Sequence, residues 1–146
     1  MILLDVNLLI YAVDADSPRH ARARRWLEHT LSSDTPVGLP WTVVLAFLRV
    51  TTRAGVLRTQ LSVDQAIGFI DEWLAQPYVV AIGPGEAHWP ILKNLLLDAG
   101  SAGNLTSDAH LAALAIENGC EIASADHDFR RFAGLKLFNP LIESKP

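Results

Sequence analysis

The sequence is poor in cysteine and contains no long apolar run. Its 146 residues include one cysteine, Cys120, which excludes an internal disulfide, and no Cys/His spacing indicates a zinc site. No stretch reaches the roughly 18 apolar residues that span a bilayer, and the N-terminus lacks the basic start of a secretory signal. We therefore expect a cytoplasmic protein without a membrane partner, in which Cys120 is a small core residue.

Positive charge is scarce as well. The formal net charge is −4 at pH 7 and the isoelectric point is near 5.6. This balance argues against a protein that coats nucleic acid by bulk electrostatics, although a local basic patch could still guide a phosphate chain. Hydrophobic residues make up 50% of the chain, so we expect one domain, residues 1–146, with a sizeable core.

Short apolar segments alternate with amphipathic ones along the chain. We expect strands at 2–5, 37–39, 78–82, 121–124 and 135–138, with the strand at 78–82 buried throughout. We expect helices at 6–13, 17–33, 41–53, 62–76, 86–99 and 106–119. Asp16 or Ser17 is expected to cap the second helix, and Thr106 or Ser107 the last. The alternation predicts an α/β fold with three layers, in which helices flank both faces of a mainly parallel central sheet.

Aspartates follow two of these strands and open one helix. The stretches are LLDVN, IASADHDF and LTSDAHLAALA, which carry Asp5, Asp126, Asp128 and Asp108. The carboxyl ends of parallel strands meet at one edge of a sheet, so Asp5, Asp126 and Asp128 are expected to share it. Asp108 joins them if its helix begins at the same edge.

Each of these carboxylates also has a simpler interpretation. Asp108 could stabilise the first turn of its helix, and Asp126 and Asp128 could be caps or turn formers. Asp5 is different, because a carboxylate at the end of a buried strand must be paired, hydrated or metal-bound, and no lysine or arginine is near it in sequence. Two such charges about 4 Å apart repel by about 4 kcal/mol at an effective dielectric of about 20. A divalent cation would remove this repulsion, and Mg²⁺ suits oxygen ligands.

A cation bound by these acids points to hydrolysis of a phosphodiester bond. It could activate a water molecule and neutralise the charge that develops on the phosphate. Asn7 could hold the metal's water shell or the scissile phosphate, or it could cap a helix. His110 and His127 are candidate general acids or phosphate contacts, with a structural role as the alternative.

Four segments together resemble a known family. LLDVNLLIYA, GLPWTVVLAFLRVTT, GNLTSDAHLAALAIENG and IASADHDFRRF are similar, in this order, to the PIN-domain toxins called VapC, in a branch abundant in mycobacteria and other actinobacteria. The resemblance covers nearly the whole chain. It implies a PIN-like fold and an Mg²⁺-dependent endoribonuclease, with Mn²⁺ as a substitute ion, that inhibits translation and growth as a toxin. It also implies a VapB-type antitoxin, a tRNA or rRNA substrate and a homodimer.

The resemblance also assigns roles to residues. The metal-binding acids would be Asp5, Asp108 and Asp126, with Asp128 and Asn7 completing the catalytic set. Many PIN domains carry a further glutamate where this chain has Ala46, which leaves one ligand fewer and makes a firmly bound second metal doubtful.

Candidate RNA contacts surround the acids. Helical spacing puts Thr42 and Arg49 on the face of Ala46, and Arg130 and Arg131 follow the ADHDF turn. The arginines at positions 19, 22, 24 and 25 are expected to form a solvated helix face.

Large apolar side chains are expected mainly in the core. This applies to Trp41, Trp73 and Trp89, although one or two of them could belong to an exposed interface. The helix over 43–50 is apolar almost all round, which favours burial against a partner or a second copy.

Two other functions remain open. Ala46 is compatible with a non-catalytic RNA-binding module that kept the fold and lost turnover. A receiver-like signalling domain also gathers aspartates at strand ends, but it needs a lysine near them, and Lys136 and Lys145 are poorly placed.

Overall fold

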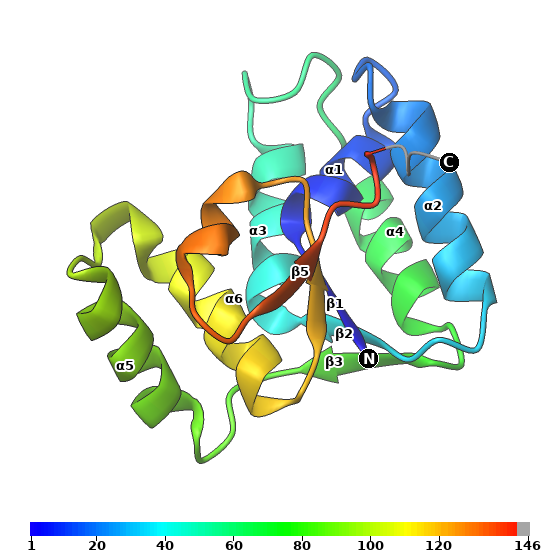
Figure 1. Ribbon diagram of the computed structural model, residues 1–146. Coiled ribbons are helices and arrows are strands. Elements are labelled where there is room, and N and C mark those ends of the chain that lie inside the picture. The colour runs from blue at the N-terminus through cyan, green and yellow to red at the C-terminus, as the bar shows by residue number, and fades with distance from the viewer. Residues whose placement is uncertain (143–146) are drawn as a thin grey trace.

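Five short strands form a central sheet in which every pairing is parallel. The computed structural model describes residues 1–142 (Figure 1), so Lys145 lies outside the described residues. The strands are β1 (Ile2–Leu4), β2 (Val37–Pro40), β3 (Val79–Ile82), β4 (Glu121–Ala123) and β5 (Lys136–Phe138). Their order is β3-β2-β1-β4-β5, which confirms the predicted parallel α/β fold.

Helices cover the sheet as two layers. They are α1 (Val6–Val13), α2 (His20–Ser32), α3 (Trp41–Thr52), α4 (Val63–Leu74), α5 (His88–Ala99) and α6 (Thr106–Glu117), with 3₁₀ turns η1 (Gly103–Leu105) and η2 (His127–Arg131). α1 packs against α2 and α3, and α3 against α4, whereas α5 packs against α6 (Figure 1). Right-handed crossovers explain this division, because β1, β2 and β3 proceed in one direction from β1 and β4 and β5 in the other. Within residues 1–142, no helix is long and apolar enough to cross a membrane.

The core forms where the strands meet the apolar helix faces. Leu3 and Ile122 on the central strands are fully buried, and the alanines of α6 let that helix approach the sheet closely. Phe47 and Trp73 meet edge to face in the other layer, with ring centroids 5.0 Å apart. Cys120 is buried, as expected, and it is a free thiol.

The helix starts differ from the predicted caps. α2 begins at His20, three residues beyond Ser17, whose hydroxyl accepts a hydrogen bond from the Arg19 amide. Asp16 does not cap α2 either, because its carboxylate accepts from the Thr59 hydroxyl at 2.9 Å and makes no hydrogen bond to the start of the helix. α6 has no side-chain cap, since η1 runs directly into it.

Several apolar side chains are more exposed than the sequence suggests. β3 lies at the edge of the sheet, and Val80 on it is 53% exposed, so the prediction of continuous burial was wrong. Trp73 is buried in the core, whereas Trp41 and Trp89 are 52% and 62% exposed, which is the alternative that the sequence left open for one or two of the three. An apolar sequence cannot distinguish an edge strand from a central one, because both carry β-branched residues.

Two glycines provide a matched test of this packing. A Cβ on Gly38 would lie 2.5 Å from Ile82 Cδ1 and closer still to Leu3 Cδ2, whereas a Cβ on Gly68 would meet nothing within 4 Å. We expect Gly38→Ala to lower the free energy of unfolding by about 1–3 kcal/mol through overpacking. Gly68→Ala, inside α4, should raise it by about 0.5–1 kcal/mol. Urea denaturation of both variants checks this, and an unchanged stability of Gly38→Ala would contradict the packing described.

Candidate active site

The site forms where the strand order reverses. The chain runs from β1 to β2 and β3 on one side and returns to β4 on the other side of β1, which is the position where open α/β sheets bind ligands. The Asp5 amide donates to the Ala123 carbonyl at 3.1 Å, which extends the β1–β4 pairing by one residue. Asp5 and the segment after β4 are therefore held at the same edge.

Asp5 is a buried carboxylate that forms no ion pair with a lysine or arginine among residues 1–142. One of its oxygens accepts from the Val6 amide at 2.7 Å and the other from the Ser124 hydroxyl at 2.5 Å. Burial raises the pKa of Asp5 above its usual value, the two hydrogen bonds oppose that shift, and the nearby charge of Asp126 adds to it. The side chain is 9% exposed, so water compensates its charge poorly.

Ser124 links the two strand ends, and the sequence analysis did not single it out. Its hydroxyl donates to Asp5, accepts from the Asp126 amide at 2.9 Å, and lies 3.3 Å from the Asn7 Nδ2 donor. Asn7 also accepts from the Ala125 amide through Oδ1, at 3.4 Å. A hydroxyl residue that ends an apolar strand two residues before an aspartate was the available signal.

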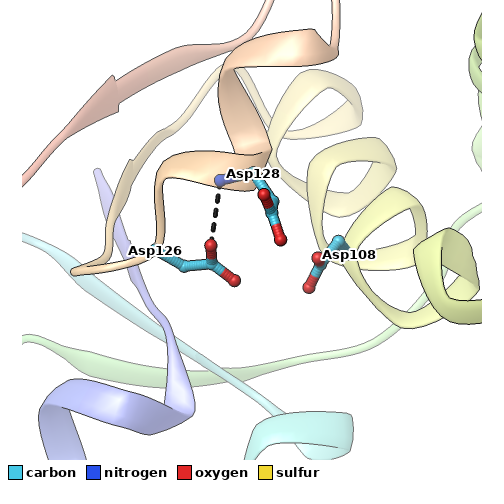
Figure 2. A group of neighbouring side chains, drawn as sticks. All are labelled: Asp108, Asp126 and Asp128. Carbon is cyan, nitrogen blue, oxygen red and sulfur yellow. Dashed lines mark hydrogen bonds between the residues drawn. The ribbon is translucent and has the colours of Figure 1, made fainter.

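Three further carboxylates converge beside Asp5. Asp108, Asp126 and Asp128 each offer an oxygen, and these oxygens lie within 4.8 Å of one another. Figure 2 shows the three side chains directed toward one another from the first turn of α6 and from the segment that begins η2. Asp126 also caps η2, since its Oδ1 accepts from the Asp128 amide at 2.9 Å. The carboxylate of Asp108 makes no hydrogen bond to any residue in 1–142, so it does not act as a helix cap.

This crowding changes the titration of Asp108. Burial, and then the charges of Asp126, Asp5 and Asp128, raise the pKa of Asp108 from 3.8 to about 6, and Arg131 opposes the shift. Arg131 pairs with Asp128 at 3.5 Å on the surface. Across the described part of the chain, no lysine or arginine forms an ion pair with Asp5, Asp108 or Asp126. Oxygen ligands that repel one another and lack a cation fit a divalent metal ion.

The predicted RNA contacts differ in their exposure and in the bonds that they make. Arg131 contacts Asp128 through both its carbonyl and its carboxylate. Arg130 and Arg49 are exposed and make no hydrogen bond or ion pair within residues 1–142. Thr42 and Ala46 are half-buried on α3.

The two candidate histidines lie in different surroundings. His110 is directed toward α5, where its Nδ1 lies 3.0 Å from Nε2 of buried His88. Burial lowers the pKa of His110, and the neighbouring His88 lowers it further. His127 lines a cavity beside α2 together with Arg22 and Arg25. His110 therefore contributes to the α5–α6 contact, and His127 lies on the side where the arginines gather.

Comparison with known proteins agrees with this geometry. The model of the PIN domain matches residues 2–135. The chain belongs to the PIN-domain family. Ribonuclease VapC33 of Mycobacterium tuberculosis is 44% identical over 143 residues, which cover 98% of this chain and 100% of that protein. Ribonuclease VapC37 of the same organism is 41% identical, with 96% and 97% covered. These relatives confirm the resemblance to VapC PIN-domain proteins.

Solved structures show the same fold at low sequence identity. A chain of the VapBC2 complex of Rickettsia felis, bound to a promoter DNA fragment, superposes with a TM-score of 0.71 at 19% identity, covering 95% of this chain and 98% of that one. A chain of the FitAB complex bound to the IR36 DNA fragment gives 0.72 at 20% identity, with 99% of both chains covered. The PIN-like architecture expected from the sequence is confirmed.

The raised pKa of Asp108 predicts how pH affects the metal-free protein. Folded Asp108 holds its proton up to about pH 6 and unfolded Asp108 only to about 3.8, so the folded state binds more protons between these values. Stability in EDTA should therefore fall as pH rises through this window. Asp108→Asn should reduce that fall and unfold at a higher temperature than the parent at pH 7. Thermal unfolding across the pH range measures both effects.

A divalent ion should reverse this order of stability. At a concentration of 100 times its dissociation constant, an ion raises the parent's free energy of unfolding by about 2.7 kcal/mol. The free energy of unfolding of Asp108→Asn should rise much less. If Asp108→Asn is less stable than the parent in EDTA at pH 7, the ionised Asp108 carboxylate is not destabilised by burial and repulsion as described.

Proposed function

We propose that this protein is a metal-dependent endoribonuclease and the toxin of a VapBC-type toxin–antitoxin pair. The observation that carries the proposal is the convergence of Asp108, Asp126 and Asp128 within 4.8 Å, beside buried Asp5. Of these four acids, Asp128 alone pairs with an arginine in the described part of the chain. Relatives that match almost the whole chain are named ribonucleases. The substrate is RNA, of the tRNA or rRNA class.

The donor set supports Mg²⁺, with Mn²⁺ as a substitute. The ligands are carboxylate oxygens, and neither cysteine nor histidine is among them. Asp108, Asp126 and Asp128 would hold the ion, and Asp5 would complete the negative charge around it. When bound, such an ion lowers the pKa of a water molecule and stabilises charge on a phosphodiester.

The chain's own groups position these ligands. Ser124 donates to Asp5 and so leaves the orientation of that carboxylate fixed by two hydrogen bonds. Asn7 holds the Ala125 amide, which fixes the segment that carries Asp126. The half-buried Asp108 stands at the N-terminal turn of α6, where the helix dipole favours its charged form. Asp5 and Asp126 would therefore be oriented before the ion binds.

The partner proposals follow from the relatives and from the surface. We assign a VapB-type antitoxin as the protein partner, since the fold matches chains of VapBC complexes. Homodimerisation is supported by exposed apolar side chains on α3 and β3, where Leu45 is 63% exposed and Val80 is 53% exposed. A cytoplasmic location fits both partners.

Cleavage by the purified protein tests the proposal. We expect RNA cleavage with Mg²⁺ or Mn²⁺, none in EDTA, and a loss of at least about a hundredfold in Asp108→Asn and in Asp5→Asn. The loss follows because each substitution removes a negative charge that would stabilise the bound cation. Ser107→Ala, an exposed position beside Asp108, serves as the control and should cleave like the parent.

Two other results would contradict the proposal, each in its own way. Equal cleavage by the parent and both aspartate variants would reject the site. RNA binding that is insensitive to EDTA, with no cleavage under any metal, would instead support the non-catalytic module that Ala46 allows.

Ser124 gives a finer test of ligand positioning. Ser124→Ala removes the hydroxyl that donates to Asp5 and that accepts from the Asp126 amide, yet leaves all four carboxylates in place. Loss of such an outer partner costs about 10–100-fold in metal affinity or activity. We expect this loss to appear as a higher Mg²⁺ concentration at half-maximal cleavage. Ser124→Thr keeps the hydroxyl and should recover part of the affinity, and full activity of Ser124→Ala would contradict the role.

A further inference from the structure

One arginine lies at the edge of the acidic cluster. η2 brings Asp128 and Arg131 to the same side of its axis, because residues three apart eclipse one another in a 3₁₀ turn. Buried Phe129 and Phe132 anchor this turn, with ring centroids 6.4 Å apart. Arg131 is therefore held beside a carboxylate of the trio formed by Asp108, Asp126 and Asp128, whereas Arg130 leaves the turn on another side.

Two contacts hold the guanidinium of Arg131. Its Nε donates to the Asp128 carbonyl at 3.1 Å, and a terminal nitrogen lies 3.5 Å from the Asp128 carboxylate. The first bond anchors the guanidinium on the backbone. The second is long and lies at the surface, where the two side chains are 47% and 61% exposed, so it adds little to stability. The contact with the carboxylate can therefore be exchanged while the anchor stays in place.

The charge of Arg131 also reaches a second acid of the trio. Burial and then the neighbouring acids raise the pKa of Asp108, and the positive charge of Arg131 opposes that rise. Neither Asp108 nor Asp126 pairs with a lysine or arginine among residues 1–142, and Asp128 pairs with Arg131 alone. Arg131 therefore stands at the place where a divalent ion would also bind.

Arg131 and a divalent ion compete for the same carboxylate. Asp128 contributes one of the three oxygens that lie within 4.8 Å of one another. If Asp128 ligates an ion, the ion repels the guanidinium, so Arg131 loses its contact with the carboxylate. It keeps the bond from Nε to the Asp128 carbonyl, and its two terminal nitrogens become available to another anion. A guanidinium binds phosphate oxygens through two parallel N–H donors.

We propose that Arg131 is a catalytic residue, which pairs with Asp128 in the metal-free protein and contacts the non-bridging oxygens of the scissile phosphate when Asp128 binds an ion. This role rests on the ribonuclease function proposed above and adds a residue to its site. A guanidinium fixed at the phosphate stabilises the negative charge that develops there in the transition state. Arginine keeps its proton at every pH used, so Arg131 forms and breaks no covalent bond.

A metal titration tests the competition for Asp128. Calorimetric titration of Mn²⁺ without RNA should give Arg131→Gln a dissociation constant about two- to fivefold lower than that of the parent, because a competing cation is gone. Arg24→Gln is the matched control. Arg24 also forms a surface ion pair, with Glu28 at 2.9 Å, but it lies on α2, which carries none of the four acids. Its substitution should leave the dissociation constant and the cleavage rate unchanged.

Cleavage at saturating Mn²⁺ tests the contact with the phosphate. Arg131→Gln should lower kcat by about a hundredfold or more and leave KM within about threefold of the parent. Arg131→Lys keeps the charge without the paired donors, so it should recover part of the kcat, and it replaces the glutamine variant if that variant does not fold. Arg130→Gln removes an exposed arginine of the same turn and should affect KM alone.

The outcomes separate this role from the proposed function. If the parent cleaves RNA and Arg131→Gln keeps its kcat or changes KM alone, the catalytic role is rejected and the ribonuclease stands. Weaker Mn²⁺ binding by Arg131→Gln would reject the competition, and an equal loss of kcat in Arg24→Gln would reject a specific role for Arg131. If the parent cleaves no RNA with any divalent ion, the ribonuclease and the catalytic role are both rejected, and the titration still decides the competition for Asp128.

Discussion

The hydrogen bond between Ser124 and Asp5 joins the ends of β1 and β4, and the site depends on it. β1 and β4 are far apart in sequence, and their parallel pairing brings Asp5 and Ser124 together at 2.5 Å. The same hydroxyl accepts the Asp126 amide and so sets where the second acidic segment begins. One neutral side chain thus organises two negatively charged ones, which a lysine or arginine would do at the cost of cancelling their charge.

Separation of charge is the second constraint on this molecule. The chain is acidic overall, and its carboxylates gather at the edge where strand order reverses, while arginines of α2 gather in the neighbouring cavity. Asp128 pairs with Arg131 on the surface, and Arg19 donates to the uncharged hydroxyl of Tyr11. The acidic edge therefore carries a negative potential that favours a bound cation.

Much of the fold follows from the sequence, because apolar periodicity and strand order are local and topological properties. Short apolar segments followed by amphipathic ones predict the parallel sheet, and LLDVN and IASADHDF predict acids at one edge. Features that depend on a distant partner were missed or wrong. Ser124 is an ordinary strand-end serine until β1 lies beside it, Val80 is exposed only because β3 is an edge strand, and the α2 arginines become a cavity wall only through contact with residues 139–142.

The carboxylates also show how one residue serves both the fold and the site. Asp126 uses one oxygen to cap η2, and its carboxylate lies beside those of Asp108 and Asp128 (Figure 2). Asp5 accepts the first amide of α1 and the hydroxyl proton of Ser124. Their positions are therefore fixed by local backbone hydrogen bonds before any ligand binds. Asp108 lies beside these fixed charges, and burial together with the charges of Asp126, Asp5 and Asp128 raises its pKa. Because backbone hydrogen bonds already hold Asp5 and Asp126 in place, a bound cation does not have to order these two side chains.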